Sequence, residues 1–155
     1  MQPVLARTKE DVQTAVGEWR AAGASIGFVP TMGALHEGHV ALVRAARAGN
    51  DRVVVSIFVN PTQFNSASDL AAYPRREAGD VDLLVAAGVD LVYLPAADEM
   101  YPTGFATAVE VAGISDGLCG AFRPGHFRGV ATVVTKLLLQ VAPDRAYFGD
   151  RKSVV

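Results

Sequence analysis

Two of the chain's three histidines lie three residues apart in the stretch VPTMGALHEGH, residues 29–39. Gly33 and Gly38 allow the backbone to turn tightly around them. A short apolar segment precedes the stretch and a helical pattern follows it, so His36 and His39 are expected on one side of a helix start. Helix N-termini favour anions, and an imidazole N–H can donate to a phosphate oxygen. The spacing therefore predicts a phosphate site.

Two other interpretations of these histidines stay open on the residues alone. Two partly exposed histidines could simply cap a helix, and His36, His39 and His126 together could hold a catalytic zinc ion. The stretch differs from the zinc motif H-E-x-x-H, in which the histidines are four residues apart. It also lacks the Walker Gly-Lys-Ser/Thr sequence and the G-x-G-x-x-G fingerprint.

The elements that must position these residues alternate along the chain. Apolar periodicity and capping residues predict helices over 8–22, 37–49, 75–87 and 125–141. Apolar runs predict strands over 25–29 (ended by Pro30), 52–59, 89–94 and 144–149, with a possible further strand over 107–111 and a loop over 60–74. This alternation predicts an α/β fold with a doubly wound, mostly parallel sheet.

Three unusual loops follow three of the predicted strands. They are PTMGALHEGH after the first, NPTQF after the second and GDRKS after the last. Because ligands of open parallel sheets bind beyond the carboxyl ends of the strands, these loops are expected to converge on one site.

Composition narrows the classes of partner. The chain has 155 residues, a net charge of −2 and a mean hydropathy of +0.24, without the basic excess typical of nucleic-acid binders. Its apolar runs are too short for a membrane span. The N-terminus has no secretory pattern and Cys119 is the only cysteine, so we expect a cytoplasmic protein with neither a nucleic-acid nor a membrane partner.

Three segments together resemble one known family. VPTMGALHEGH, SIFVNPTQF and RPGHFRGVATVVTKLL are similar to the pantoate–β-alanine ligase (pantothenate synthetase) family, and the similarity runs from about residue 3 to Gly149. The first segment resembles the family's version of a His-x-Gly-His nucleotide-binding motif. The resemblance implies a Rossmann-like fold of the HIGH-type nucleotidyltransferase superfamily.

The resemblance also implies a two-step reaction. ATP and pantoate would give a pantoyl adenylate and pyrophosphate, and β-alanine would then attack the adenylate to give pantothenate and AMP. Mg²⁺ would accompany the ATP, and the protein would form a homodimer. The motif suits this chemistry, because imidazoles and helix N–H groups can stabilise the charge that builds on the phosphate oxygens in the transition state.

Site residues follow from the same resemblance. His39 corresponds to the position usually given the role of catalytic acid, His36 to a second phosphate contact, and Gln63 to a residue that binds pantoate beside β-alanine. A neutral amide such as Gln63 can hydrogen-bond hydroxyl groups without pairing with the reacting carboxylate. The positions similar to the family's ATP site are Met32, Gly33, Ala34, Leu35, His36, Glu37, Gly38, His39, Gly149, Asp150, Arg151 and Lys152. No residue is assigned as a protein ligand to a metal ion.

The last residues depart from the family pattern. Arg151 stands where the family has a lysine that binds phosphate, and Lys152 where it has an aspartate. Arg151 keeps the charge but not the compact ammonium group. We expect residues 1–155 to be an N-terminal nucleotide-binding domain without the family's C-terminal lid domain. Two alternatives stay open: a catalytically impaired nucleotide-binding module of the same fold, and another nucleotidyltransferase of the superfamily.

Overall fold

The chain folds around one parallel sheet. The computed structural model describes residues 2–112 and 125–149. In this part of the chain five strands pair in the order β1-β4-β3-β2-β5, each pair parallel. Their bounds are Val4–Ala6 (β1), Ile26–Thr31 (β2), Arg52–Ile57 (β3), Leu91–Tyr93 (β4) and Arg145–Ala146 (β5). The predicted α/β fold is confirmed.

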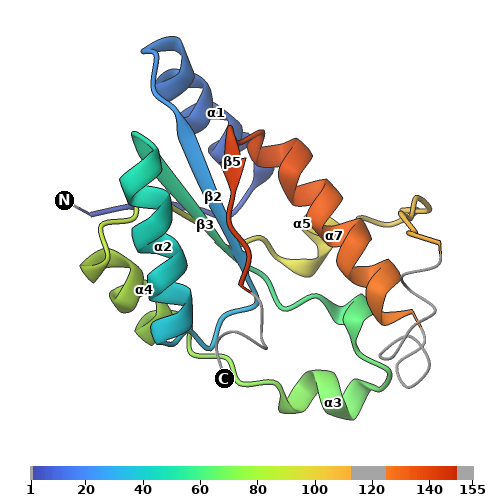
Figure 1. Ribbon diagram of the computed structural model, residues 1–155. Helices are drawn as coiled ribbons and strands as arrows, with labels where there is room; N and C mark the ends of the chain where they lie inside the picture. The colour runs from blue at the N-terminus through green and yellow to red at the C-terminus, as the bar shows by residue number, and fades with distance from the viewer. Residues whose placement is uncertain (1, 113–124, 150–155) are drawn as a thin grey trace.

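Helices cover both faces of this sheet (Figure 1). The helices of the described part of the chain are α1 (Lys9–Ala21), α2 (Glu37–Gly49), α3 (Ala67–Ala72), α4 (Glu77–Ala86), α5 (Ala97–Met100) and α7 (His126–Val141), with a 3₁₀ turn η1 at Pro61–Gln63. Helices α1 and α7 lie on one face, and α2 and α4 lie on the other. The sheet is therefore doubly wound, as its apolar strands predict.

Each face has its own buried core. Val16 of α1 and Leu137 of α7 pack with Phe28 on one face, and Val43 of α2 and Leu84 of α4 pack with neighbouring strand residues on the other. The two cores hold the ends of α2 and α7 at fixed positions relative to the strands.

The sheet has its switch point beside β2. The chain continues from β2 to β3 on one side, whereas β5 pairs on the other side of β2. In a doubly wound sheet the ligand crevice lies outside the carboxyl ends of the strands at such a point. The motif-bearing loop leaves the sheet here, at the end of β2.

Pro30 does not end the strand before it, contrary to the sequence-based expectation. Strand β2 continues through Pro30, which pairs with Ser56 of β3. The carbonyls of Ile26 and Phe28 accept bonds on the β5 side, from Asp144 and Tyr147, so residue 30 faces that same side. The next bond between β2 and β5 would need a backbone N–H at residue 30. Proline has none, and the pairing of β5 with β2 ends at this point.

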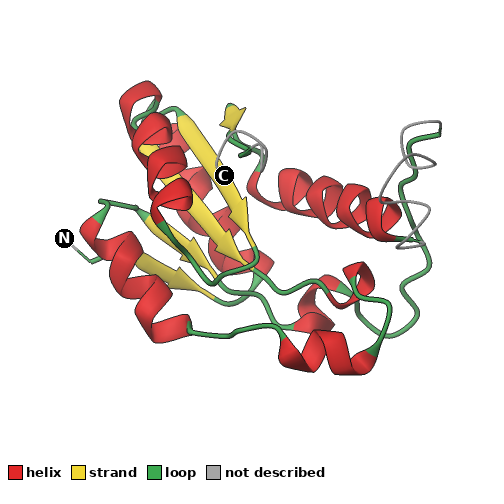
Figure 2. Cartoon of the chain, turned by 60° about the horizontal axis from the view of Figure 1, so that its bottom comes forward, coloured by secondary structure: helices red, strands yellow, loops and turns green. Residues whose placement is uncertain are grey.

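Two further predictions are wrong. Residues 60–74 are not loop throughout: they contain η1 and α3, which Ser66 caps by accepting from the Asp69 amide. Figure 2 shows α3 lying away from the sheet. Residues 107–111 form no strand, because the backbone there binds a helix instead: the Val109 amide donates to Thr132 Oγ1 of α7 at 2.9 Å.

Strand β1 was absent from the sequence-based expectations. Its three residues pair only with β4, and Val4 and Leu5 are exposed. A strand this short at the sheet edge carries too few residues to show an apolar pattern.

Candidate functional site

The two histidines of the motif form a reciprocal cap at the start of α2. His36 is the N-cap, and its Nδ1 accepts from the Gly38 amide at 3.0 Å. The His36 amide in turn donates to His39 Nδ1 at 3.1 Å. The two rings lie side by side with their centroids 4.2 Å apart. This arrangement is a capping box in which histidines replace the usual Ser/Thr and Glu/Gln pair.

The cap determines which nitrogen of each ring carries the proton. A ring nitrogen that accepts a hydrogen bond from an amide is unprotonated, so both Nδ1 atoms are acceptors. In the neutral ring the proton then lies on Nε2, at the opposite edge. The helix-cap and phosphate interpretations are thus compatible, because they use different nitrogens of His36 and His39.

The surroundings of His39 favour the neutral ring. Burial lowers the pKa of His39 from its ordinary value, the nearby His36 lowers it further, and the carboxylate of Asp80 opposes both effects. Protonation would also place a hydrogen on Nδ1 and break the bond from the His36 amide. His39 is therefore built to donate from Nε2 as a neutral group.

The remaining residues around the motif contribute mainly backbone. Leu35 is buried against the α2 face of the sheet, so its side chain faces the core. Gly33 and Ala34 both have positive φ, at 81° and 51°. Glu37 is exposed in the first turn of α2. The loop amides at residues 33–35 already have acceptors within the protein, so the loop shapes the carboxyl edge of the sheet and the helix N-terminus faces it.

Gln63 lies against the motif loop. Its Nε2 donates to the sulfur of Met32 at 3.4 Å, and its Oε1 accepts from Asn60 Nδ2 at 2.9 Å. Its backbone oxygen lies 3.3 Å from Nδ1 of His126 at the start of α7. The structure therefore brings the loops after β2 and β3 together, as their positions after parallel strands predict.

Asn60 is a buried residue that hydrogen-bonds to several elements, and the sequence alone did not single it out. It is fully buried, and its Nδ2 also donates to the Gly129 carbonyl of α7 at 3.1 Å. Its Oδ1 accepts from the amide and the hydroxyl of Thr62 and from the Tyr101 hydroxyl. Asn60 thus joins the Gln63 loop to α7 and to the segment after α5. The sequence did contain one signal for this role, because Asn60 is a polar residue directly after a predicted apolar strand.

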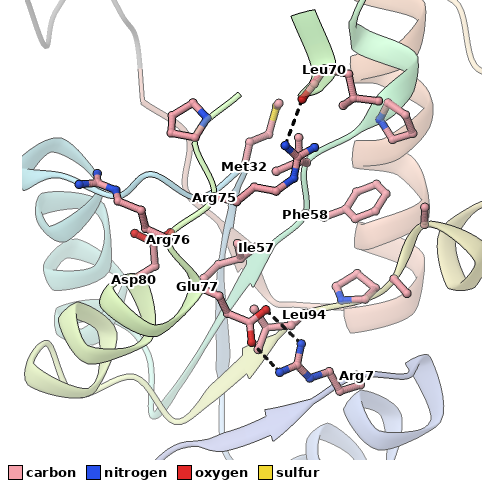
Figure 3. A pocket seen from close by; sticks show the side chains of 17 residues that line it. Arg7, Met32, Ile57, Phe58, Leu70, Arg75, Arg76, Glu77, Asp80 and Leu94 are labelled. Atoms are coloured by element: carbon pink, nitrogen blue, oxygen red, sulfur yellow. Dashed lines mark hydrogen bonds and ion pairs between the residues drawn. The ribbon is translucent and has the colours of Figure 1, made fainter. Parts of the chain in front are cut away.

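A hollow of about 460 Å³ opens beside the motif loop (Figure 3). Met32 and Gly33 of the motif loop and the apolar side chain of Phe58 are among the residues that line it. Two cations on its walls already have partners: Arg7 Nη2 lies 2.6 Å from Glu77 Oε1, and Arg75 donates to backbone carbonyls of α3 and the residue after it. The hollow therefore adjoins the start of the motif loop, at Met32 and Gly33, and His36 and His39 are not among the residues that line it.

The described residues offer no protein cage for a metal ion. No group of three or more His, Cys, Asp or Glu side chains in residues 2–112 and 125–149 is placed to hold one. His126 contacts the Gln63 backbone instead of completing a cluster with His36 and His39. No helix in the same ranges is long and apolar enough to cross a membrane.

Only part of the third predicted loop is described. The Tyr147 amide donates to the Phe28 carbonyl, and Gly149 lies near Leu42 of α2, where an added Cβ would be 3.5 Å from its Cδ1. The chain after β5 thus returns to the helix that carries the histidines. Asp150, Arg151, Lys152 and Cys119 lie outside the described residues.

A parallel sheet of this order, with a His-x-Gly-His motif capping the helix at its switch point, defines a Rossmann-like fold of the HIGH-type nucleotidyltransferase class. The sequence profile described as Pantoate-beta-alanine ligase matches residues 4–154. The chain belongs to this family.

Relatives with established structures and names agree with this assignment. The pantothenate synthetase of Chelativorans sp. (strain BNC1) is 59% identical over 151 residues, which cover 97% of this chain and 53% of that protein. The crystal structure of pantothenate synthetase from Thermus thermophilus has a TM-score of 0.84 at 51% identity, covering 97% of this chain and 53% of that one.

A second solved structure contains ligands. The pantoate-beta-alanine ligase of Francisella tularensis, complexed with beta-gamma ATP and beta-alanine, has a TM-score of 0.88 at 40% identity and covers 93% of this chain and 55% of that one. The chain therefore spans about half the length of the relatives that it matches.

Proposed function

We propose that this chain is the nucleotide-binding domain of an ATP-dependent ligase that joins pantoate to β-alanine. The observation that carries the proposal is the reciprocal cap of His36 and His39, beside the N-terminus of α2, in which neither Nε2 has a hydrogen-bond partner within residues 2–112 and 125–149. Family membership and the ATP- and β-alanine-bound relative support the choice of substrates.

The first step would be attack of the pantoate carboxylate on the α-phosphorus of ATP. The bond from the α-phosphorus to the bridging oxygen breaks, pyrophosphate leaves, and pantoyl adenylate forms. Negative charge builds on the phosphate oxygens, and the Nε2–H groups of His36 and His39, beside the N-terminus of α2, would stabilise it as preorganised donors. His39, at the position usually given the role of catalytic acid, is proposed to donate a hydrogen bond from its neutral Nε2–H to the phosphate.

The second step would be attack of the β-alanine amine on the acyl carbon of the adenylate. The bond from the acyl carbon to the AMP oxygen breaks, the nitrogen loses a proton to solvent, and pantothenate and AMP are formed. Gln63 is proposed to hydrogen-bond the pantoate hydroxyls during both steps, since its amide already lies against Met32 of the motif loop. Its neutral amide leaves the carboxylate free to react.

Mg²⁺ is proposed to arrive with ATP and to neutralise part of the phosphate charge. It prefers oxygen ligands and commonly binds through substrate phosphates and a few carboxylates, with water completing its shell. A nucleotide site without a protein metal cage is consistent with that mode, so no residue of the chain is assigned as its ligand.

Three further features are proposed from the sequence and the family resemblance. Asp150, Arg151 and Lys152 would extend the nucleotide site from the end of β5. The protein would be a homodimer. It would lie in the cytoplasm, a location that the single cysteine supports. Sedimentation velocity on the purified chain tests the dimer.

The decisive experiment separates nucleotide binding from the first chemical step. Calorimetry with Mg·ATP measures binding by the 155-residue chain, and pantoate-dependent exchange of labelled pyrophosphate into ATP measures adenylate formation. Binding together with exchange supports the ligase. Binding without exchange would favour an impaired nucleotide-binding module, and exchange with other carboxylic acids would favour another nucleotidyltransferase. No binding of ATP would contradict the proposal.

A further inference from the structure

A buried carboxylate on a neighbouring helix holds the loop in front of the histidines. Asp80 lies in the first turn of α4 and is only 3% exposed. Its Oδ2 accepts from the Ala34 amide and its Oδ1 accepts from the Leu35 amide, each at 2.9 Å. Each oxygen of the carboxylate thus binds one of two consecutive loop amides, more than forty residues away in the sequence.

The loop needs such a partner because of its backbone conformation. Gly33 and Ala34 have φ of 81° and 51°, in the left-handed region that a residue with a side chain rarely adopts. This conformation directs successive amides to the same side, where they form a concave donor site for an anion. Without an acceptor the part-buried Ala34 amide and the buried Leu35 amide would lack partners, which is costly.

The packing leaves Asp80 little freedom. A Cβ added at Gly33 would lie 3.1 Å from Asp80 Oδ2 and 3.1 Å from Ile57 Cγ2. The glycine therefore lets the loop approach the carboxylate and the end of β3 closely. Asp80 is also near enough to influence the titration of His39.

We propose that Asp80 is a positioning residue of the nucleotide site, which fixes the 33–35 loop so that His36 caps α2 and the Nε2 edges of both histidines face the ligand. The proposal rests on the proposed function for the identity of that ligand. A carboxylate beside a phosphate site is electrostatically unfavourable in itself. Here each of its oxygens faces a backbone donor, so the carboxylate shapes the site instead of contacting the phosphates.

The test compares Asp80→Asn with Asp82→Asn on the same helix. Asp82 is exposed and its side chain makes no hydrogen bond to another described residue, so its variant controls for the lost charge. The asparagine at position 80 offers one oxygen, and its NH₂ group opposes the second loop amide. Circular dichroism and thermal unfolding establish first that both variants are folded.

Two readouts follow on the folded variants. In the chain free of nucleotide and divalent cation, Asp80→Asn should speed hydrogen exchange at the Ala34 and Leu35 amides at least tenfold, and change the ¹⁵N shift of His39 Nδ1. In calorimetry, it should weaken Mg·ATP binding at least tenfold at a temperature well below unfolding. Asp82→Asn should match the unaltered chain in both.

Several results would overturn the proposal. A folded Asp80→Asn chain with unchanged amide exchange, or with unchanged ATP affinity beside an unaltered chain that binds ATP, would show that Asp80 only stabilises the fold. If the variant does not fold, hydrogen exchange is measured on the unaltered chain alone. Fast exchange at both amides would refute the proposal, and slow exchange at both would support it. If the unaltered chain does not bind ATP, the proposed function fails, while the exchange and ¹⁵N readouts still judge Asp80.

Discussion

Gly129 of α7 lies directly against Thr62 of the η1 turn, with no room for a side chain between them. A Cβ added at Gly129 would be 2.7 Å from Thr62 Oγ1 and 2.9 Å from the Thr62 carbonyl oxygen. The first turn of α7 thus fits against the backbone that carries Gln63. This contact links the helix to the loop after β3, so disturbing it should affect both stability and substrate recognition.

We expect Gly129→Ala to destabilise the chain by about 1–3 kcal/mol, the usual cost of overpacking a tight contact. Urea unfolding measures the change. Gly17→Ala is the matched control, because Gly17 lies in helix α1 with nothing within 4 Å of the added Cβ. That control should gain about 0.5–1 kcal/mol. Equal effects of the two substitutions would contradict the packing argument.

The two nitrogens of His39 can be tested separately. In His39→Asn the side-chain oxygen can replace Nδ1 as the acceptor for the His36 amide, but no donor remains in place of Nε2–H. We expect near-normal stability and a pyrophosphate-exchange rate lower by ~10²–10³, the usual effect of losing one transition-state donor. His39→Ala should lose the cap as well, costing about 0.5–2 kcal/mol of stability.

Two outcomes would count against this separation. If His39→Asn retained exchange, the phosphate role of Nε2 would be wrong. If His39→Asn and His39→Ala were equally unstable, the capping role of Nδ1 would be wrong.

Stability should depend on pH through His39. Its pKa is lowered in the folded chain, so between that value and the ordinary value near 6.5 the unfolded chain binds the proton and the folded chain does not. The unfolding free energy should therefore rise as pH rises through this window and lose that contribution below it. Urea unfolding from about pH 5 to about pH 8 tests this, with His39→Asn as the comparison. An identical pH profile for the two chains would refute it.

Asn60 should be needed for the fold of the Gln63 loop. Replacing it by alanine removes the acceptor for the part-buried Tyr101 hydroxyl and the donor to the buried Gly129 carbonyl, which leaves both groups without these partners. We expect Asn60→Ala to cost about 1–3 kcal/mol or more, measured by urea unfolding. Asn65→Ala, at an exposed position shortly after η1, should be near neutral. An unchanged free energy of unfolding in Asn60→Ala would contradict this role of Asn60.

Periodicity in the sequence was sufficient to predict the helices that flank the sheet and the carboxyl edge where the loops meet. Helices α1, α2 and α7 begin and end within two residues of their predicted bounds. They could be predicted because their caps and apolar stripes are local. The short helix α3 and the three residues of β1 could not, since too few residues were available to form a pattern.

The chemistry of the site was predictable only in part. The histidine spacing indicated a helix start and an anion site, but not that Nδ1 of each ring caps the helix. The usual capping box contains Ser or Thr and Glu or Gln, so a pair of histidines gives no such signal. Asp80 could not be found because its partners lie in a distant loop and only the folded sheet brings them together.

Pro30 has a consequence for the space in which ligands would lie. Strand β5 stops pairing with β2 where the next ladder bond would require an amide at residue 30. A full-length partner strand would close the sheet beside the histidines and fill that side of β2 with backbone. Because Pro30 has no amide to donate, it interrupts the ladder and keeps β2 and β5 from pairing as far as their carboxyl ends.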